Sequence, residues 1–478
     1  MFLRMIYDEK LAQAAYLIGC QRTGEAIIID PERDVDRYID LAAENDLRIV
    51  AAAETHIHAD FVSGCRELAE RVGAKVYLSD EGDADWKYQW LDAKADEELD
   101  GGSYDYRLLK DGDAFTVGNI DFRVLHTPGH TPEHIAFLVT DRGAGADAPV
   151  GVATGDFVFV GDLGRPDLLE SAAGIDGAME PAARRLHKTI GRLDEIPEFV
   201  QVWPAHGAGS ACGKALGAVP TSTIGYEKRF NPAIRAADSE QGFVDFILAG
   251  QPEPPMYFAR MKRDNKAGPA VLGSLPSPSK ISADELRALD PRRVAIVDTR
   301  DWEHFRAGHL PGSLSFPLIR SFPTDVGSMV RDDEDVYLVV EGANLEEAVR
   351  DLVRIGLDNI RGWCPAAEIA TAARLDGIEE VAVEDAIGLV DSPDVAVLDV
   401  RRRTEFAEGH LPGATNIAHT RLAGRMDEVP RGSMLLINCL SGERSARACG
   451  YLKRAGFDVA NLRGGMLAWE NAAAAVQR

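Results

Sequence analysis

Residues 48–61 have the sequence RIVAAAETHIHADF, and this stretch decides the fold of the first half of the chain. The apolar run RIVAAA predicts a strand, and the turn after it carries His56, His58 and Asp60 at alternating positions. Alternate side chains of an extended segment point the same way, so these donors can face one point. The stretch therefore predicts a metal site at the rim of a sheet.

Three further motifs place a donor directly after an apolar strand. TPGHT contains His130, ATGD contains Asp156 and WPAHG contains His206. A single loop histidine is ordinarily a surface residue, whereas four such strand ends favour one shared site.

In this order, the four motifs resemble the metallo-β-lactamase superfamily, over roughly the first 240 residues. The resemblance implies an αββα sandwich. Hydrolases of this superfamily that use two zincs carry a His directly after the Asp of the first motif. Phe61 stands at that position here and cannot bind a metal, which favours a site for one metal.

The segment GDLGRPDL, residues 161–168, is similar to the persulfide dioxygenase branch of the superfamily. That resemblance implies one Fe(II) per chain, held by His56, His130 and Asp156. Two histidines and one carboxylate leave open positions for O₂ and a substrate sulfur. His58, Asp60 and His206 would then orient the ligands. The resemblance also implies a substrate-binding role for Arg165, Tyr226, Lys228 and Arg229.

The C-terminal half contains one segment twice. VAIVDTRDWEHFRAGHLPG, residues 294–312, and VAVLDVRRRTEFAEGHLPG, residues 395–413, are offset by 101 residues (399 − 298 for the shared Asp). Strands that alternate with helices in each copy predict two small α/β domains with parallel sheets.

In the second copy, the apolar run MLLIN ends at Cys439, and a helical stretch follows the short loop. Backbone N–H groups and the helix dipole favour a thiolate there and would cradle a persulfide. Gly442 allows the tight turn, and Arg444 adds positive charge. This pattern resembles a rhodanese domain, which implies Cys439 as nucleophile. The remaining residues of the persulfide loop are Leu440, Ser441, Glu443 and Ser445.

The first copy departs from this pattern, because Glu341 aligns with Cys439 and the loop is two residues shorter (17 steps from Cys439 to Gly456, 15 from Glu341 to Gly356). We expect an inactive rhodanese-like domain. The predicted organisation is a persulfide dioxygenase domain (1–250), a linker (251–280), the inactive domain (281–373) and the active rhodanese (374–478).

The net charge of −25 disfavours nucleic acid and anionic membranes as partners. No signal segment is evident, and six scattered cysteines suit a reducing compartment, so we expect a cytoplasmic protein. The family resemblance also suggests a homo-oligomer.

The resulting hypothesis is oxidation of a thiol persulfide, of glutathione or coenzyme A, by O₂ to sulfite. Sulfur transfer through Cys439 would make or use thiosulfate, in sulfide detoxification. One alternative is a zinc thioester hydrolase of the glyoxalase II type with attached rhodanese domains. A second is a non-enzymatic sulfur-relay or sensing protein with a structural metal.

Overall fold

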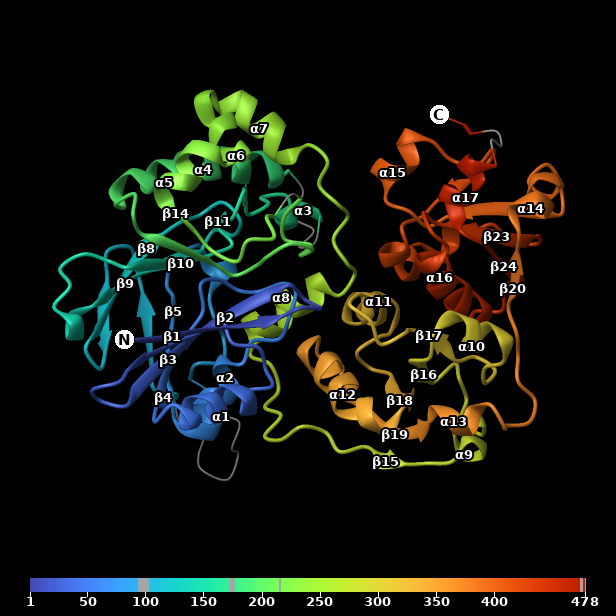
Figure 1. The fold of residues 1–478 in the computed structure, drawn as a ribbon, viewed down its shortest axis with the longest axis horizontal. Coiled ribbons are helices and arrows are strands. Elements are labelled where there is room, and N and C mark those ends of the chain that lie inside the picture. Colours follow the sequence, from blue (N-terminus) through green and yellow to red (C-terminus); the bar gives the residue numbers. More distant parts are fainter. Residues whose placement is uncertain (93–102, 172–176, 215, 473–475, 478) are drawn as a thin grey trace. The chain divides into compact units, whose positions relative to one another are not determined.

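A computed structural model describes residues 1–92, 103–171, 177–214, 216–472 and 476–477 (Figure 1). The chain divides into two compact units. Unit 1 comprises Met1–Pro254 and Phe258–Leu275, and unit 2 comprises Pro255–Tyr257 and Pro276–Arg478.

Unit 1 contains two six-stranded sheets. In sheet order, the strands of the first are β1 (Phe2–Asp8), β2 (Gln13–Cys20), β3 (Glu25–Ile29), β4 (Arg48–Ala53), β5 (Lys75–Ser79) and β6 (Tyr106–Leu109). Those of the second are β14 (Ser222–Thr223), β13 (Gln201–Pro204), β10 (Gly151–Gly155), β9 (Ile135–Asp141), β8 (Ile120–His126) and β7 (Ala114–Val117). A short hairpin pairs β11 (Val158–Phe159) with β12 (Asp162–Leu163).

Alternating side chains divide the core of unit 1 into three layers. Tyr16 and Ile18 of β2 meet Phe122 and Phe137 of the other sheet in one apolar cluster. The intervening Leu17 packs on the opposite face, in a cluster that includes residues of α1 (Asp36–Glu44) and α2 (Cys65–Val72). A third cluster joins the second sheet to α4 (Met179–Ile190) and α7 (Glu240–Leu248). The predicted αββα sandwich is confirmed (Figure 1).

Four further α-helices and several 3₁₀ turns complete the described part of unit 1, and one of these helices lies within the predicted linker. Helix α8 (Phe258–Ala267) falls inside 251–280, and its Phe258, Met261 and Asn265 are buried in the unit. The domain boundaries themselves stay predictions. The other helices are α3 (Leu168–Ser171), α5 (Ile224–Phe230), α6 (Pro232–Arg235) and the 3₁₀ turn η4 (Gly191–Glu195).

Unit 2 contains two five-stranded parallel sheets with the same strand order. The first is β15 (Ser279–Lys280), β19 (Ile360–Pro365), β18 (Asp335–Val340), β16 (Val294–Asp298) and β17 (Leu314–Ser315). The second is β20 (Glu379–Val381), β24 (Val459–Leu462), β23 (Met434–Asn438), β21 (Val395–Asp399) and β22 (Thr415–Asn416). The repeated sequence thus builds the same architecture twice.

Helices flank both sheets of unit 2. With the first sheet come α9 (Ala283–Arg287), α10 (Trp302–Ala307), α11 (Phe322–Met329), α12 (Leu345–Arg354) and α13 (Ala366–Ile369). With the second come α14 (Val383–Leu389), α15 (Arg403–Glu408), the 3₁₀ segment η7 (His419–Glu428), α16 (Glu443–Arg454) and α17 (Gly465–Asn471).

The repeated Asp-x-Arg motif performs a structural task in both copies. Asp399 ends β21 and accepts hydrogen bonds from Arg401, whose Nη2 also donates to the Gly409 carbonyl at 2.6 Å. Asp298 likewise accepts hydrogen bonds from Arg300, whose Nη2 donates to the Gly308 carbonyl at 2.9 Å. The motif therefore ties each strand end to its GHLPG turn.

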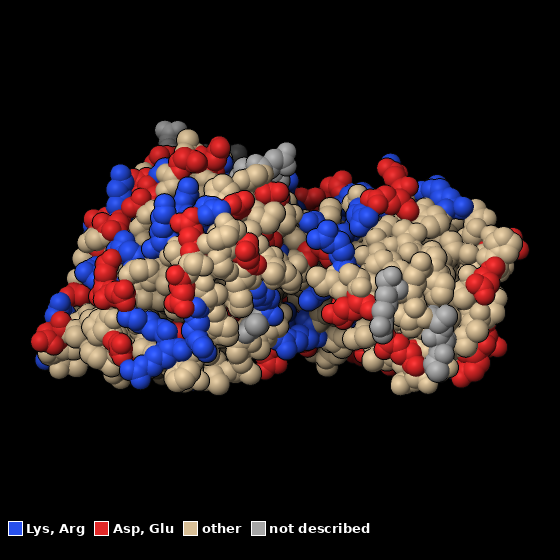
Figure 2. Space-filling model, turned by 90° about the horizontal axis from the view of Figure 1, so that it is seen from above, with Lys and Arg blue, Asp and Glu red and all other residues tan. Residues whose placement is uncertain are grey.

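Acidic and basic side chains are interspersed on the face of the molecule seen in Figure 2. Within the described residues, no helix is long and apolar enough to cross a membrane.

Candidate metal centre and persulfide loop

The loops that follow β4, β8 and β10 bring His56, His130 and Asp156 together, each of them buried. Their ligand atoms all lie within 4.8 Å of one another. Nε2 of His130 is 3.4 Å and Nε2 of His56 is 4.0 Å from Oδ2 of Asp156. That carboxylate oxygen is buried without a hydrogen-bond partner. An orphaned buried oxygen between two imidazole nitrogens is the arrangement that a metal ion satisfies.

In both candidate histidine ligands, the second ring nitrogen, Nδ1, is held by a neighbouring polar group. Nδ1 of His56 is 2.9 Å from the Thr55 hydroxyl, and Nδ1 of His130 is 3.0 Å from the Arg165 carbonyl oxygen. Burial is the main cause that lowers the pKa of both histidines, so the rings are neutral. Neutral imidazoles held at Nδ1 present a lone pair at Nε2, as metal ligation requires.

Asp156 is held by its backbone as well as by its side chain. Its N–H donates to Nε2 of His134 at 3.0 Å, and Nδ1 of His134 is 2.7 Å from the Thr127 hydroxyl. The preceding Gly155 has a φ of +52°, and a Cβ there would lie 2.5 Å from the Thr55 hydroxyl oxygen. Burial raises the pKa of Asp156, but His206 and His130 outweigh it and hold that pKa well below its ordinary value. The carboxylate is therefore ionised.

The residues predicted to orient the ligands lie in the same cluster. His206 bridges two carboxylates, with Nδ1 2.8 Å from Oδ1 of Asp156 and Nε2 2.7 Å from Oδ2 of Asp60. Burial lowers the pKa of His206, but the two carboxylates raise it well above its ordinary value. Nε2 of His58 is 3.1 Å from Oδ1 of Asp30. Phe61 is buried against the His58 ring.

Several supporting residues were missed by the sequence analysis. Asp30 accepts hydrogen bonds from the backbone and hydroxyl of Thr55, and Asn265 donates to the carbonyls of His58 and Phe61. Cys212 is buried beside Asp60 and His206, and these three form a second group of potential ligands. Their positions in the sequence carry no periodic or motif signal, because the contacts arise only on folding.

A small pocket of about 20 Å³ reaches His130. Its walls are mainly apolar and include Trp86, Leu168 and Phe258, with Lys262 as the charged member. Burial lowers the pKa of Lys262 to about 8, although Glu133 opposes this shift. The approach to the candidate metal centre is therefore narrow and poor in water-binding groups.

The predicted substrate-binding residues have partners of their own. The buried Arg165 guanidinium donates to both oxygens of Asp167 and to the carbonyls of Ala211 and Pro252. Lys228 pairs with Asp194 and Arg229 with Glu198, while the exposed Tyr226 ring contacts Phe230. Substrate contact by these four residues stays a prediction.

Cys439 lies where β23 passes into α16, and its side chain is buried. The Gly442 N–H donates to Sγ at 3.1 Å, and the Ser445 hydroxyl lies 3.4 Å from it. Gly442 has a φ of +95°, a conformation that favours glycine. Arg444 makes two bonds to Glu405, at 2.6 and 2.7 Å. Of the other loop residues, Leu440 is exposed, and Ser441 and Glu443 line a pocket described below.

Comparison with known proteins defines the class. The metallo-beta-lactamase superfamily model matches residues 9–196, and the rhodanese-like domain model matches residues 382–472. A crystal structure of a metallo-beta-lactamase from Staphylococcus aureus is similar to this chain, with 42% sequence identity and a TM-score of 0.68. The match covers 76% of this chain and 99% of that chain. The chain therefore belongs to the metallo-β-lactamase superfamily and carries a C-terminal rhodanese-like domain.

Three curated relatives each match a part of the chain. A probable metallo-hydrolase of Burkholderia pseudomallei is 30% identical (51% of this chain, 84% of the relative). The mitochondrial persulfide dioxygenase of Bos taurus is 25% identical (50% and 78%). A sulfurtransferase of Allochromatium vinosum is 42% identical (17% and 77%). The chain thus combines a metal-binding fold with homology to sulfurtransferases.

Proposed function

We propose that this chain oxidises a low-molecular-weight thiol persulfide with O₂ and transfers sulfane sulfur through Cys439. The observation that carries the first activity is the orphaned Oδ2 of Asp156 beside Nε2 of His56 and His130. Two histidines and a carboxylate are the donor set of non-haem Fe(II) oxygenases. The homology to a persulfide dioxygenase supports the same assignment.

The residues of unit 1 fit a single ferrous ion per chain. Bound at His56, His130 and Asp156, iron would supply the redox chemistry that brings O₂ and a thiol sulfur together. His134 and Thr55 hold the ligands in place, and the apolar walls near His130 exclude water. The overall reaction is RSSH + O₂ + H₂O → RSH + SO₃²⁻ + 2H⁺.

Cys439 performs the second reaction without an external oxidant. Its thiolate attacks the outer sulfur of a persulfide: Cys–S⁻ + RSSH → Cys–SSH + RS⁻. One S–S bond breaks, a new one forms, and the thiol leaves with the electron pair. Sulfite then takes the outer sulfur: Cys–SSH + SO₃²⁻ → Cys–SH + S₂O₃²⁻. The Gly442 N–H and the Ser445 hydroxyl lie where they stabilise the charged sulfur.

A zinc hydrolase is the second candidate function. Asp60, His206 and Cys212 form a second group of potential ligands beside the first, and a probable metallo-hydrolase is among the relatives. In this structure, however, His206 bridges the carboxylates of Asp60 and Asp156. In addition, Phe61 directly follows Asp60, where the two-zinc hydrolases that this chain resembles carry a His, and a phenyl ring cannot bind a metal.

Oxygen uptake and metal analysis separate these functions. The full chain, loaded anaerobically with iron, is mixed with glutathione persulfide or coenzyme A persulfide. We expect about one iron per chain and one O₂ consumed per persulfide. His130→Ala should reduce both iron content and uptake. Two zincs per chain with thioester hydrolysis and no O₂ uptake would establish the hydrolase. Absence of both reactions would favour a sulfur-relay protein.

A further inference from the structure

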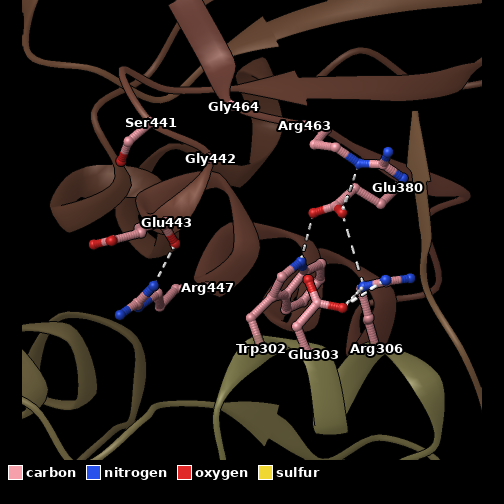
Figure 3. Close-up of a pocket in the computed structure, with 10 residues that line it drawn as sticks. All are labelled: Trp302, Glu303, Arg306, Glu380, Ser441, Gly442, Glu443, Arg447, Arg463 and Gly464. Carbon is pink, nitrogen blue, oxygen red and sulfur yellow. Dashed lines mark hydrogen bonds and ion pairs between the residues drawn. The ribbon is translucent and has the colours of Figure 1, made fainter. Parts of the chain in front are cut away.

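Both rhodanese-like domains contribute to a pocket beside the Cys439 loop (Figure 3). Its volume is about 460 Å³. The loop supplies Ser441, Gly442 and Glu443, whereas α10 of the inactive domain supplies Trp302, Glu303 and Arg306. The inactive domain therefore forms one wall of a pocket next to the loop that follows Cys439.

Glu380 attaches this wall to the active domain. Nε1 of Trp302 donates to Oε1 of Glu380 at 2.8 Å, and Nε of Arg306 lies 3.8 Å from Oε2. The Glu380 side chain is 8% exposed. From the active domain, Arg463 donates to the same carboxylate (Figure 3). A buried carboxylate shared by the two domains fixes the position of α10.

A chain of hydrogen bonds continues from Glu380 to the nucleophile. Nδ2 of Asn461 lies 3.3 Å from Oε1 of Glu380 and donates to the Gly442 carbonyl at 3.2 Å. The Gly442 N–H in turn donates to Sγ of Cys439. Phe305 of α10 also packs in the same apolar cluster as Cys439. The inactive domain is thus in continuous contact with the persulfide loop.

The composition of the pocket indicates its ligand. Three arginines and three glutamates line it, so the formal charges balance. Sulfite and thiosulfate are small inorganic anions and would fill little of 460 Å³, a volume typical of sites for whole organic ligands. A thiol with several phosphates would need an excess of cations. Balanced charges instead suit a thiol that carries both ammonium and carboxylate groups.

We propose that this pocket binds the organic part of a peptide-like, zwitterionic thiol persulfide, with Arg306 and Trp302 of the inactive domain as specificity-determining residues. Trp302 acts as a positioning residue through Glu380. The proposal rests on sulfur transfer at Cys439, as written above. It gives the inactive domain a role in choosing the sulfur donor.

The test compares an organic with an inorganic sulfur donor on the full chain, without O₂. On this proposal, sulfur transfer from glutathione persulfide to sulfite requires the pocket. Sulfur transfer from thiosulfate to cyanide does not. Arg306→Ala should raise KM for glutathione persulfide about fivefold to tenfold, because a charge-assisted contact is lost, with kcat retained. KM for thiosulfate should change by less than about twofold. Trp302→Phe keeps an aromatic ring but removes the Nε1–H group that donates to Glu380. It should also raise KM for glutathione persulfide.

Arg331→Ala is the matched control, because Arg331 belongs to the same domain and pairs with the exposed Asp333. Arg331→Ala should leave KM unchanged for both glutathione persulfide and thiosulfate. An unchanged KM for glutathione persulfide in both pocket variants would overturn the proposal. An equal rise in KM for thiosulfate, or for the polyanionic coenzyme A persulfide, would also overturn the proposal. Failure of the proposed function would look different, since Cys439→Ser would then retain transfer from both donors.

Discussion

At the scale of single residues, Asp156 directs each of its polar groups to a different neighbour. Its N–H bonds to His134, its Oδ1 to His206, and its Oδ2 faces His56 and His130. Because Nε2 of His134 accepts this hydrogen bond, the proton of that ring sits on Nδ1. Burial is the main cause that holds the pKa of His134 well below its ordinary value, which keeps the acceptor available. His134 thus orients the candidate ligand Asp156.

Removal of His134 tests this role. His134→Ala should weaken metal affinity by about 10- to 100-fold, as for other groups that orient ligands, while the fold persists. Competition with a chelator measures the affinity, and circular dichroism checks the fold. His126→Ala is the matched control, because that ring ends β8 and bonds to the Pro132 carbonyl rather than to Asp156. Equal affinity of the two variants would contradict the role of His134.

The candidate ligands and their supports differ in how well sequence predicts them. His56, His130 and Asp156 follow strands in short motifs, so their positions at strand ends marked them as candidate donors. The family resemblance then singled them out from His58, Asp60 and His206. Asp30, Asn265 and Cys212 were not found, because they approach the site from distant segments. Asn265 lies within the predicted linker, whose Pro, Ser and Gly content obscured the buried face of α8.

At the scale of elements, α11 joins the two sheets of unit 2 through Asp325. Its carboxylate is buried, with Oδ1 3.2 Å from Nε2 of His419 and Oδ2 3.3 Å from Nε of Arg447. Burial raises the pKa of Asp325, but the bonds with His419 and Arg447 lower it below its ordinary value overall. One ionised carboxylate therefore ties η7 and α16 to the inactive domain.

Asp325→Asn should destabilise unit 2 by about 3–5 kcal/mol, because the buried Arg447 guanidinium loses its charged partner and His419 loses a carboxylate acceptor. Denaturant unfolding of the full chain measures the change. Asp333→Asn, at an exposed pair with Arg331, is the control and should change stability by less than about 1 kcal/mol. Similar effects from the two variants would contradict the importance of the buried pair.

The same carboxylate predicts a pH dependence. Its folded-state pKa lies below the unfolded value of about 3.9, so its stabilisation is complete above that pH. The stabilisation is lost as pH falls through the lower folded-state pKa. Unfolding curves of the wild type and Asp325→Asn between about pH 7 and 3 should therefore converge toward low pH. A constant difference across that range would show that Asp325 does not titrate as described.

At the scale of the whole molecule, the chain joins a metal-binding sandwich to a pair of similar parallel sheets, and the second of these is followed by the Cys439 loop. Covalent linkage raises the effective concentration of one site for the product of the other. The net charge of −25 disfavours anionic ligands globally, so local arginines must offset it. In the pocket beside the Cys439 loop, three arginines balance the charge of three glutamates.

Much of this architecture was predictable, since the strand-end motifs and the 101-residue repeat indicate the fold class and its order along the chain. The contact between the two rhodanese-like domains was not. The α10 residues that reach the Cys439 loop occupy ordinary helical positions, and their role depends on how one sheet packs beside the next. Similarly, Asp-x-Arg is a repeated motif whose structural task becomes evident only from its bonds to the GHLPG turn.

The central claim is that oxidation occurs in the sandwich and sulfur transfer at Cys439. The most direct test measures O₂ uptake together with sulfite and thiosulfate, for iron-loaded wild-type protein and Cys439→Ser supplied with glutathione persulfide. The account predicts thiosulfate as the product of the wild type. Cys439→Ser should accumulate sulfite at an unchanged rate of O₂ uptake. Loss of O₂ uptake in Cys439→Ser, or thiosulfate formation without Cys439, would contradict this division of labour.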